Sequence, residues 1–368
     1  MVKFLDLKSQ YHSIKNEIDS AISDVLESSV FVGGNKVKNF EAEFAGYLGA
    51  EYCVGVGNGT DALEIALEAL GLPKGSEVLV PANSFIATSE SVTRSGLKVV
   101  FCDVDPLTHT LCLNDLKAKV TANTKCVIAV HLYGHPCDMH EVLRVAKQFN
   151  LKVVEDCAQS HGAEYRGSRV GSIGDISAFS FYPGKNLGAY GDGGAIVTNS
   201  SDLAEKCRMI ANHGRKEKYD HLFEGRNSRL DSIQAAILSV KLKHLESWTE
   251  RRISIASRYC EGLKNIKGLD VPIKKEWARH VYHLFVVKTQ RRDDLLEFLQ
   301  ANNIQSGIHY PKALPMLEAY SHLNSGDDNP VACMQSENLL SLPMGEHLSD
   351  GEVDFVISVV RAFFEATY

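Results

Sequence analysis

Residues 153–199, VVEDCAQSHGAEYRGSRVGSIGDISAFSFYPGKNLGAYGDGGAIVTN, contain the strand and loop patterns on which our interpretation of the fold rests. The apolar run at 151–154 predicts a strand that leads into Glu155 and Asp156. A second predicted strand, 176–182, leads into a loop with Lys185 at its centre and glycines on both sides. Strand ends of this kind open into the crevice where an open α/β sheet binds its ligand.

An aspartate at one strand end and a lysine just beyond a later strand form a pair that pyridoxal phosphate chemistry uses. In that chemistry the lysine forms a Schiff base, and the carboxylate keeps the pyridine nitrogen protonated so that the ring accepts electrons. Asp156 and Lys185 are therefore the candidate functional pair.

Strand and helix patterns alternate around this stretch. Helical patterns open the chain at 12–28 and 37–48, and strands are predicted at 52–57, 77–81, 98–104 and 125–131. This alternation predicts an α/β fold with a mostly parallel sheet that is covered by helices on both faces. Beyond residue 199 we expect a long helix that starts near 233, a further helix at 251–263, a strand at 281–287 and a closing helix.

The length of 368 residues favours two or three domains. We expect a large α/β domain at residues 1–245 and a small α+β domain at 246–368.

The segment GNGT, residues 57–60, joins a predicted strand to a helix. Free backbone N–H groups at the helix start, with the Thr60 hydroxyl, could hold a phosphate. A Thr or Asp cap without a ligand explains the same pattern. Phe85 follows the strand at 77–81, where its ring could stack on a planar cofactor or pack in the core.

Metal binding is disfavoured. His131 and His135 have helical spacing, and His140 follows, but Gly134 and Pro136 make this segment a strand-to-loop exit. The nine cysteines are scattered without a C-x-x-C pair, so we read them as reduced core residues, Cys157 among them.

The charge and the segments of the chain limit its partners. A net charge of −7 gives no electrostatic footprint for nucleic acid or an anionic membrane surface. The N-terminal segment lacks a basic region followed by an apolar run, and no stretch has the length of a membrane span. We therefore predict a cytoplasmic protein.

Val30 and Phe31 are apolar without an obvious local core and could pack on another subunit. Arg226 and Arg229 are either solvated charges or contacts for an anionic substrate.

Four segments together resemble the DegT/DnrJ/EryC1/StrS family of pyridoxal-phosphate-dependent nucleotide-sugar aminotransferases. They are VGNGTDALEIAL, VVEDCAQSHGA, SFYPGKNLGAYGDGGAIVTN and GRNSRLDSIQAAIL, and the resemblance extends from FLDL at the start to SLPM and the final helix. It implies the aspartate aminotransferase fold, fold type I, with a mainly parallel seven-stranded sheet in the large domain and a small C-terminal domain. It also implies a homodimer whose active sites are shared between the subunits.

The resemblance carries over to individual residues. Lys185 matches the Schiff-base lysine, and Asp156 matches the partner of the pyridine nitrogen of pyridoxal 5'-phosphate. The other implied cofactor contacts are Gln159 beside the ring hydroxyl, Phe85 as the stacking ring, Gly59, Thr60 and Ser180 around the phosphate, and Asn227 from the other subunit. Arg229, His309 and Tyr310 are the candidates for substrate binding.

Family members transfer an amino group, commonly from glutamate, to a keto sugar. The segments GNGTDAL, HLYGHPCDMHEV and HYP look more like the branch that acts on 3-keto sugars. We expect a dTDP-3-oxo-6-deoxyhexose as substrate and a 3-amino-3,6-dideoxyhexose as product, for a surface polysaccharide or a glycosylated metabolite. The alternatives are amination at C4 and a UDP-linked 2-acetamido 3-keto sugar.

Two further readings use the same fold. A related dehydratase has histidine in place of the lysine, and Lys185 argues against it. A catalytically silent regulatory or sensor protein is disfavoured by the intact set of Lys185, Asp156 and Gln159.

Overall fold

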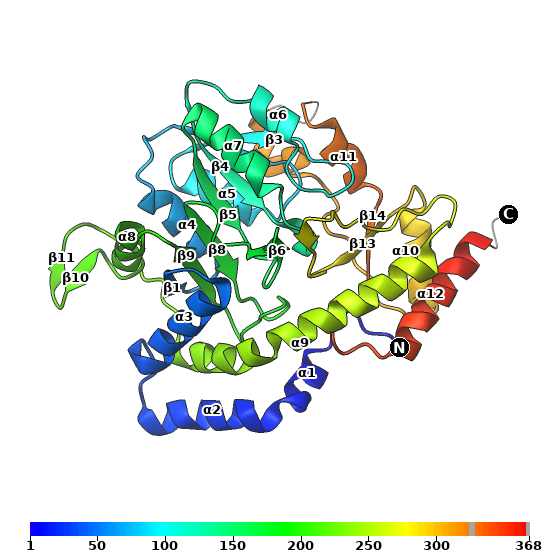
Figure 1. The fold of residues 1–368 in the computed structure, drawn as a ribbon, viewed down its shortest axis with the longest axis horizontal. Helices are drawn as coiled ribbons and strands as arrows, with labels where there is room; N and C mark the ends of the chain where they lie inside the picture. Colours follow the sequence, from blue (N-terminus) through cyan, green and yellow to red (C-terminus); the bar gives the residue numbers. More distant parts are fainter. Residues whose placement is uncertain (324–327, 366–368) are drawn as a thin grey trace.

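A seven-stranded sheet forms the centre of the computed structural model, which describes residues 1–323 and 328–365 (Figure 1). The strand order is β1-β9-β8-β5-β4-β2-β3. Only β9 runs antiparallel to its neighbours, so the sheet is mainly parallel, as the sequence predicts. The strands are β1 Tyr52–Val56, β2 Glu77–Pro81, β3 Lys98–Cys102, β4 Thr124–Val130, β5 Lys152–Asp156, β8 Ile176–Ser180 and β9 Gly194–Thr198.

Helices cover both faces of this sheet. One face packs against α4 Gly59–Ala69, α5 Ala87–Arg94 and α8 Ser201–Ala211. The other packs against α3 Gly34–Leu48, α6 Leu113–Ala118, α7 Met139–Phe149 and the first half of α9 Ser232–Leu263. Strands buried on both faces need near-continuous apolar sequence, and β4 and β9 consist almost entirely of buried residues.

A second core lies at the far end of α9 (Figure 1). There β13 Phe285–Lys288 pairs with β14 Leu339–Leu342, flanked by α10 Arg292–Ala301 and α12 Asp350–Glu365. Val2 joins this core and pairs with Ile304, so the start of the chain packs on its C-terminal part.

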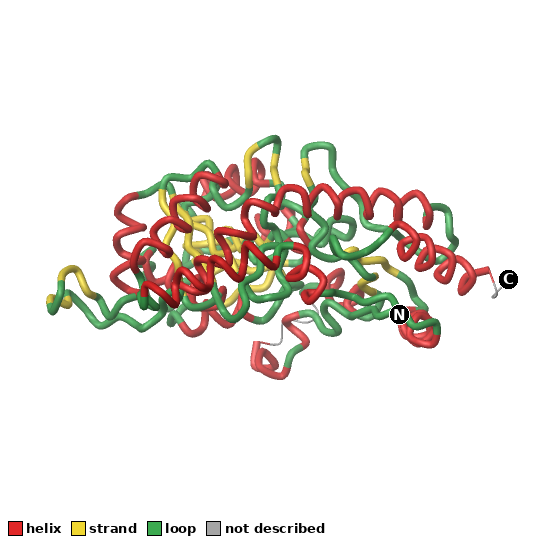
Figure 2. Tube along the Cα trace, turned by 90° about the horizontal axis from the view of Figure 1, so that it is seen from below, coloured by secondary structure: helices red, strands yellow, loops and turns green. Residues whose placement is uncertain are grey.

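The remaining elements are short or peripheral. The hairpin of β10 and β11 extends away from the rest of the chain (Figures 1 and 2). The bounds are α1 Leu7–Ser13, α2 Lys15–Ser28, α11 Pro330–Ser336, β6 Glu164–Tyr165, β7 Ser168–Arg169, β10 Arg215–Glu217, β11 Asp220–His221 and β12 Ala278–Arg279, with 3-10 turns η1 Leu132–Gly134, η2 Leu314–Met316 and η3 Glu318–Leu323.

The expected break between a helix from 233 and a helix at 251–263 is wrong, because α9 is continuous. Leu238 and Leu245 pack in the core on the sheet, whereas Ile255 and Tyr259 pack in the second core. The buried face of α9 changes from one core to the other along its length. The apolar residues therefore do not follow one continuous helical periodicity, and the sequence pattern resembles that of two separate helices. The expected domain boundary at 245/246 falls inside α9, and the division into two domains stays a prediction.

The strand expected at 281–287 is shorter than predicted. Only Phe285–Lys288 forms β13. The residues just before β13 pair with the turn after β4 instead of with a strand. Val281 N–H donates to Gly134 O, and Leu284 N–H donates to Tyr133 O. This contact brings the C-terminal part of the chain to the edge of the sheet.

Glu155 is fully buried near the end of β5 and holds two loops together. One carboxylate oxygen accepts N–H groups of Ile173 and Gly174 at 2.9 and 2.7 Å. The other accepts Gly171 N–H at 2.8 Å and His131 Nε2 at 3.0 Å. Burial by itself raises the pKa of Glu155, but these hydrogen bonds lower it below the usual range.

Among the described residues no helix has the length and apolar character needed to cross a membrane. The nine cysteines are all free, and Cys157 is fully buried, which agrees with its interpretation as a core thiol.

The Glu155 cluster predicts a large effect of a small change. Glu155→Gln replaces one acceptor oxygen with an amide NH₂ that faces N–H donors, so we expect the free energy of unfolding to fall by about 3 kcal/mol. Urea denaturation followed by circular dichroism measures this change.

Glu205→Gln is the matched control, because Glu205 is exposed on α8. Its effect should stay within about 0.5 kcal/mol. If the two variants unfold at the same urea concentration as the natural sequence, the cluster does not hold the loops.

Candidate active site

The carboxyl ends of β2, β4, β5 and β8 meet at one edge of the sheet because these strands are parallel. Asp156 ends β5, Ser180 ends β8, and Tyr133 and Phe85 follow β4 and β2. Side chains from four separate segments are therefore brought together by the strand order.

Asp156 is buried, with 5% of its surface exposed. Successive side chains of a strand point to opposite faces, so Asp156 points away from the cluster that holds Glu155. Its Oδ1 accepts Ala158 N–H at 3.1 Å, and its Oδ2 accepts the Thr88 hydroxyl at 2.7 Å. The carboxylate has a fixed orientation and retains lone pairs for a further donor.

Gln159 links two parts of the chain. Its Oε1 accepts Tyr133 N–H at 2.7 Å, and its Nε2 donates to the Tyr310 hydroxyl at 3.0 Å. The Tyr133 hydroxyl in turn donates to the carbonyl of His309 at 2.5 Å. Asn83 Nδ2 also donates to the Tyr133 hydroxyl, at 3.3 Å. The substrate candidates His309 and Tyr310 therefore lie beside a predicted cofactor residue.

Lys185 is partly buried in the loop after β8. Burial lowers the pKa of its amine to about 8, and the charge of Asp156 opposes this shift. The loop is held from behind, since Lys241 on α9 donates to Gly188 O at 2.7 Å and Gln234 accepts Tyr190 N–H at 2.8 Å. An amine with a pKa of about 8 is uncharged in about one molecule in ten at pH 7, far more often than an ordinary lysine, and this neutral form can act as a nucleophile or a base.

Gly59 lies against Ser180. A Cβ atom at Gly59 would lie 2.6 Å from Ser180 Cβ, so only glycine allows this approach. Asn58 caps α4, its Oδ1 accepting Asp61 N–H at 2.8 Å. The cap expected from Thr or Asp is therefore an asparagine, and Thr60 lies in the first turn of α4. The start of α4 and the Ser180 hydroxyl therefore lie together, and such an arrangement suits an anion.

Phe85 is 54% exposed, so core packing does not explain it. Its ring centroid lies 5.8 Å from that of Tyr310, with the planes tilted by 43°. An open aromatic face at the sheet edge can stack on a planar group.

Asn227 and Arg229 are exposed and do not bond to Lys185, Asp156 or Gln159 among the described residues. Their neighbour Ser228 donates to Asp61 at 2.6 Å and accepts Gly57 N–H at 3.0 Å. Arg226 pairs with Glu64 and Glu68 on α4, so its charge is used within the chain. The segment is anchored beside α4 with Asn227 and Arg229 facing outward.

Potential metal ligands come together at His131, Glu155 and Cys157. Glu155 already accepts four hydrogen bonds, and His131 Nδ1 accepts Cys137 N–H at 3.0 Å. The His131 proton is therefore on Nε2, toward Glu155. His135 Nδ1 donates to Pro136 O, and His140 is exposed beside Glu141. The three histidines lie in different surroundings.

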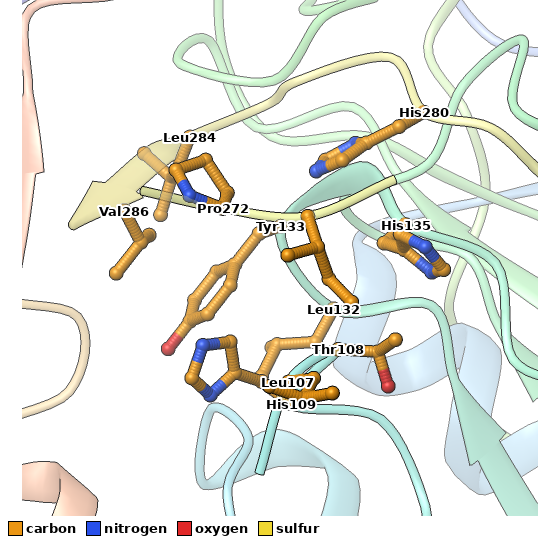
Figure 3. A pocket seen from close by; sticks show the side chains of 11 residues that line it. Leu107, Thr108, His109, Leu132, Tyr133, His135, Pro272, His280, Leu284 and Val286 are labelled. Carbon is orange, nitrogen blue, oxygen red and sulfur yellow. The ribbon is translucent and has the colours of Figure 1, made fainter. Parts of the chain in front are cut away.

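A small cavity lies behind Tyr133 (Figure 3). It has about 10 Å³ of space and is lined by His109, His135 and His280, among others. Burial lowers the pKa of His109 and of His135 to about 4, so both are neutral at pH 7. The space suits at most one water molecule, which excludes a substrate.

Sequence patterns did not reveal Tyr133 or Thr88 as site residues. Tyr133 has a positive φ of 59°, which is uncommon for a residue other than glycine. Thr88 lies on the first turn of α5, next to Ala87. Apolar periodicity marks neither residue, because both act through hydrogen bonds to segments distant in sequence.

Comparison with known proteins gives a consistent result. The family model for DegT/DnrJ/EryC1/StrS aminotransferases matches residues 12–361. The Saccharopolyspora erythraea protein named erythromycin biosynthesis sensory transduction protein EryC1 is 44% identical over 98% of this chain and 99% of its own. The dTDP-3-amino-3,6-dideoxy-α-D-galactopyranose transaminase of Aneurinibacillus thermoaerophilus is 43% identical over 99% of both chains. The UDP-N-acetyl-3-dehydro-α-D-glucosamine 3-aminotransferase of Acidithiobacillus ferrooxidans is 39% identical over 98% of this chain and 97% of its own.

The fold agrees with these similarities. The crystal structure of DesV from S. venezuelae superimposes with a TM-score of 0.95 at 42% identity, over 99% of this chain and 98% of that one. The expected class, an α/β fold of the pyridoxal-phosphate-dependent aminotransferase type, is confirmed. The chain belongs to the DegT/DnrJ/EryC1/StrS family of aminotransferases.

Proposed function

We propose that this aminotransferase moves an amino group from L-glutamate to the C3 keto group of a dTDP-3-oxo-6-deoxyhexose. The observation that carries the proposal is the Lys185 amine, with its pKa lowered to about 8, at the same sheet edge as the buried Asp156. The product is the dTDP-linked 3-amino-3,6-dideoxyhexose.

The residues at this edge fit pyridoxal phosphate, the cofactor of the family. The close approach of Gly59 to Ser180 brings the N-terminus of α4 and the Ser180 hydroxyl together, and both can donate hydrogen bonds to a phosphate. Asp156 faces the same region with lone pairs available for a protonated ring nitrogen. We assign Gly59, Thr60 and Ser180 to the phosphate, Phe85 to the ring face and Gln159 to the ring hydroxyl.

The cofactor, when bound, supplies an electron-withdrawing ring that stabilises negative charge on the neighbouring carbon. The chain supplies proton transfer and orientation. Lys185 Nζ, once free, takes a proton from carbon and returns it, and a pKa near the working pH is suited to this task. Asp156 keeps the ring nitrogen protonated, because a buried carboxylate stabilises an adjacent positive charge.

His309 and Tyr310 are our assignments for the sugar side. His309 Nδ1 lies 2.9 Å from Ser341 Oγ, and its ring stacks on Phe4 at 5.7 Å. Burial and the charge of Lys185 lower the pKa of His309, so the ring is neutral and can donate or accept one hydrogen bond. A neutral imidazole suits the hydroxyl groups of a sugar.

A homodimer completes the proposed site. Leu26, Val30, Phe31 and Val32 are 53, 45, 47 and 52% exposed, which is unusual for neighbouring apolar side chains. Asn227 and Arg229 face outward, where they can reach the phosphate and the nucleotide-sugar of a second copy. Sedimentation of the purified protein as a 40.5 kDa monomer at micromolar concentration contradicts this arrangement.

The substrate is tested with a panel of nucleotide-linked keto sugars and glutamate as donor. We expect release of 2-oxoglutarate in large excess over enzyme with dTDP-linked 3-oxo-6-deoxyhexoses. With 4-oxo sugars or UDP-linked 2-acetamido 3-oxo sugars we expect no more than the single equivalent per site that glutamate alone releases. Lys185→Ala is the control and should release none, because the proton-transferring amine is absent.

Each other outcome has a defined meaning. If only UDP-linked sugars are turned over, the proposed dTDP-linked substrate is wrong. A UDP-linked 3-oxo sugar is then the substrate, as the name of the relative from A. ferrooxidans suggests. If glutamate alone releases no 2-oxoglutarate from the cofactor-loaded protein, glutamate is not the donor and the proposal is wrong in that part. If no amino acid changes the visible absorbance of the bound cofactor, the protein is catalytically silent.

The reactivity of Lys185 should depend on pH in a defined direction. Below its pKa the ammonium group is protonated and cannot attack a reagent, so in cofactor-free protein the modification rate of Lys185 should rise with a midpoint at about pH 8. Mass spectrometry after reaction with an amine-acylating reagent measures the rate. Asp156→Asn should move the midpoint lower, because the carboxylate raises this pKa. A midpoint near the ordinary lysine value of 10.5 contradicts the geometry.

Gly59→Ala should weaken cofactor binding by more than about tenfold, since the new methyl group collides with Ser180 and displaces the phosphate contacts. Titration of the cofactor-free protein, followed by visible absorbance, gives the affinity. Gly46→Ala is the matched control, because a Cβ there meets nothing within 4 Å. Equal affinities for the two variants exclude a phosphate role for the Gly59–Ser180 contact.

A further inference from the structure

Asp156 receives a hydrogen bond that the proposed chemistry does not require. The Thr88 hydroxyl donates to its Oδ2 at 2.7 Å. Thr88 is 1% exposed on the first turn of α5, so water does not compete for this bond. A buried donor aimed at the carboxylate that faces the ring nitrogen can control the charge of that carboxylate.

The direction of the bond is fixed by a second hydroxyl. Ser84 Oγ lies 2.7 Å from Thr88 Oγ1 and is also buried, at 4% exposure. Thr88 has one hydroxyl proton, which it gives to Asp156, so Ser84 must be the donor of the second bond. The two hydroxyls form a chain that points toward Asp156, and such chains strengthen each member bond.

The chain comes from the segment that also presents Phe85. Ser84 and Thr88 flank Phe85 and are buried, whereas the Phe85 ring is exposed at the sheet edge. One segment, residues 84–88, therefore positions both the Phe85 ring and the two hydroxyl groups that lead to Asp156.

We propose that Thr88 and Ser84 are positioning residues that act through Asp156, holding its carboxylate ionised and oriented toward the ring nitrogen of pyridoxal phosphate. The inference rests on the role of Asp156 in the proposed function. A carboxylate that already accepts a strong hydrogen bond competes less well for the ring-nitrogen proton. The proton then stays on the ring, which remains electron-withdrawing.

Other groups near Asp156 do not replace this donor. Lys185 and Tyr310 both interact electrostatically with Asp156, and Cys157 follows it in the chain. Burial raises the pKa of Tyr310 and of Cys157, so both are uncharged at pH 7. Lys185 is consumed when it binds the cofactor. The hydroxyl of Thr88 and the N–H of Ala158 then remain as the donors to the carboxylate.

The test uses Thr88→Val, which keeps the shape and removes the donor, and Thr88→Ser, which restores it. In cofactor-loaded protein we expect Thr88→Val to raise the pH midpoint of the visible absorbance change by about one unit, because a less positively charged ring lets Lys185 nitrogen hold its proton more tightly. Cofactor affinity of the Thr88→Val protein should fall about tenfold. Thr88→Ser should match the natural protein in both readouts.

Thr93→Val is the control on the same helix, since Thr93 is exposed and its hydroxyl bonds only to Glu90 O among the described residues. It should leave the pH midpoint and the affinity unchanged. If Thr88→Val only damaged the structure, it would lower the stability of the protein without moving the pH midpoint. Thr88→Ser would then have no shifted midpoint to restore.

If Thr88→Val does not fold, Ser84→Ala tests the inference in its place. It removes the second donor and should move the midpoint in the same direction by a smaller amount. Unchanged midpoints in the folded variants overturn the inference. These readouts use no sugar, so they are independent of whether the proposed dTDP-linked substrate is correct.

Discussion

The structure depends on the alternation of side chains at the end of β5. Glu155 and Asp156 are adjacent carboxylates, and a strand turns them to opposite faces. Glu155 is enclosed by four hydrogen bonds, which fix β5 against the turn at 171–174 and the end of β4. Because these bonds fix the end of β5, Asp156 takes a defined position on the other face.

The same fixed edge joins distant segments. Gln159 contacts Tyr133 from the turn after β4 and Tyr310 from the C-terminal part of the chain. Tyr133 also bonds to the carbonyl of His309. The segment that we assign to the sugar is therefore attached to a residue that we assign to the cofactor, so orientation of one is coupled to orientation of the other.

Membership of the family establishes the class of chemistry but leaves the substrate to individual side chains. The residues assigned to the cofactor are held by backbone geometry, as the Gly59–Ser180 contact and the buried Asp156 illustrate. Arg229, our candidate for a substrate contact, is in contrast exposed on an anchored segment. If it has that role, a substitution there can change specificity without altering the sheet edge.

Local sequence determined the strands and helices of the large sheet, because buried parallel strands need continuous apolar runs and the helices between them have one apolar face. It also indicated Asp156 and Lys185, since chemically distinctive residues followed strands. Two features depended on long-range contacts that the sequence does not reveal: the continuity of α9 and the absence of strand structure immediately before Phe285.

The fold class and the residue types of the chemistry could thus be inferred from the sequence. The partners of those residues, such as Thr88 for Asp156 and Tyr133 for Gln159, became known only from the three-dimensional arrangement. Apolar periodicity indicates which face of an element is buried, whereas a hydrogen bond between distant segments depends on strand order and loop path, which no local pattern encodes.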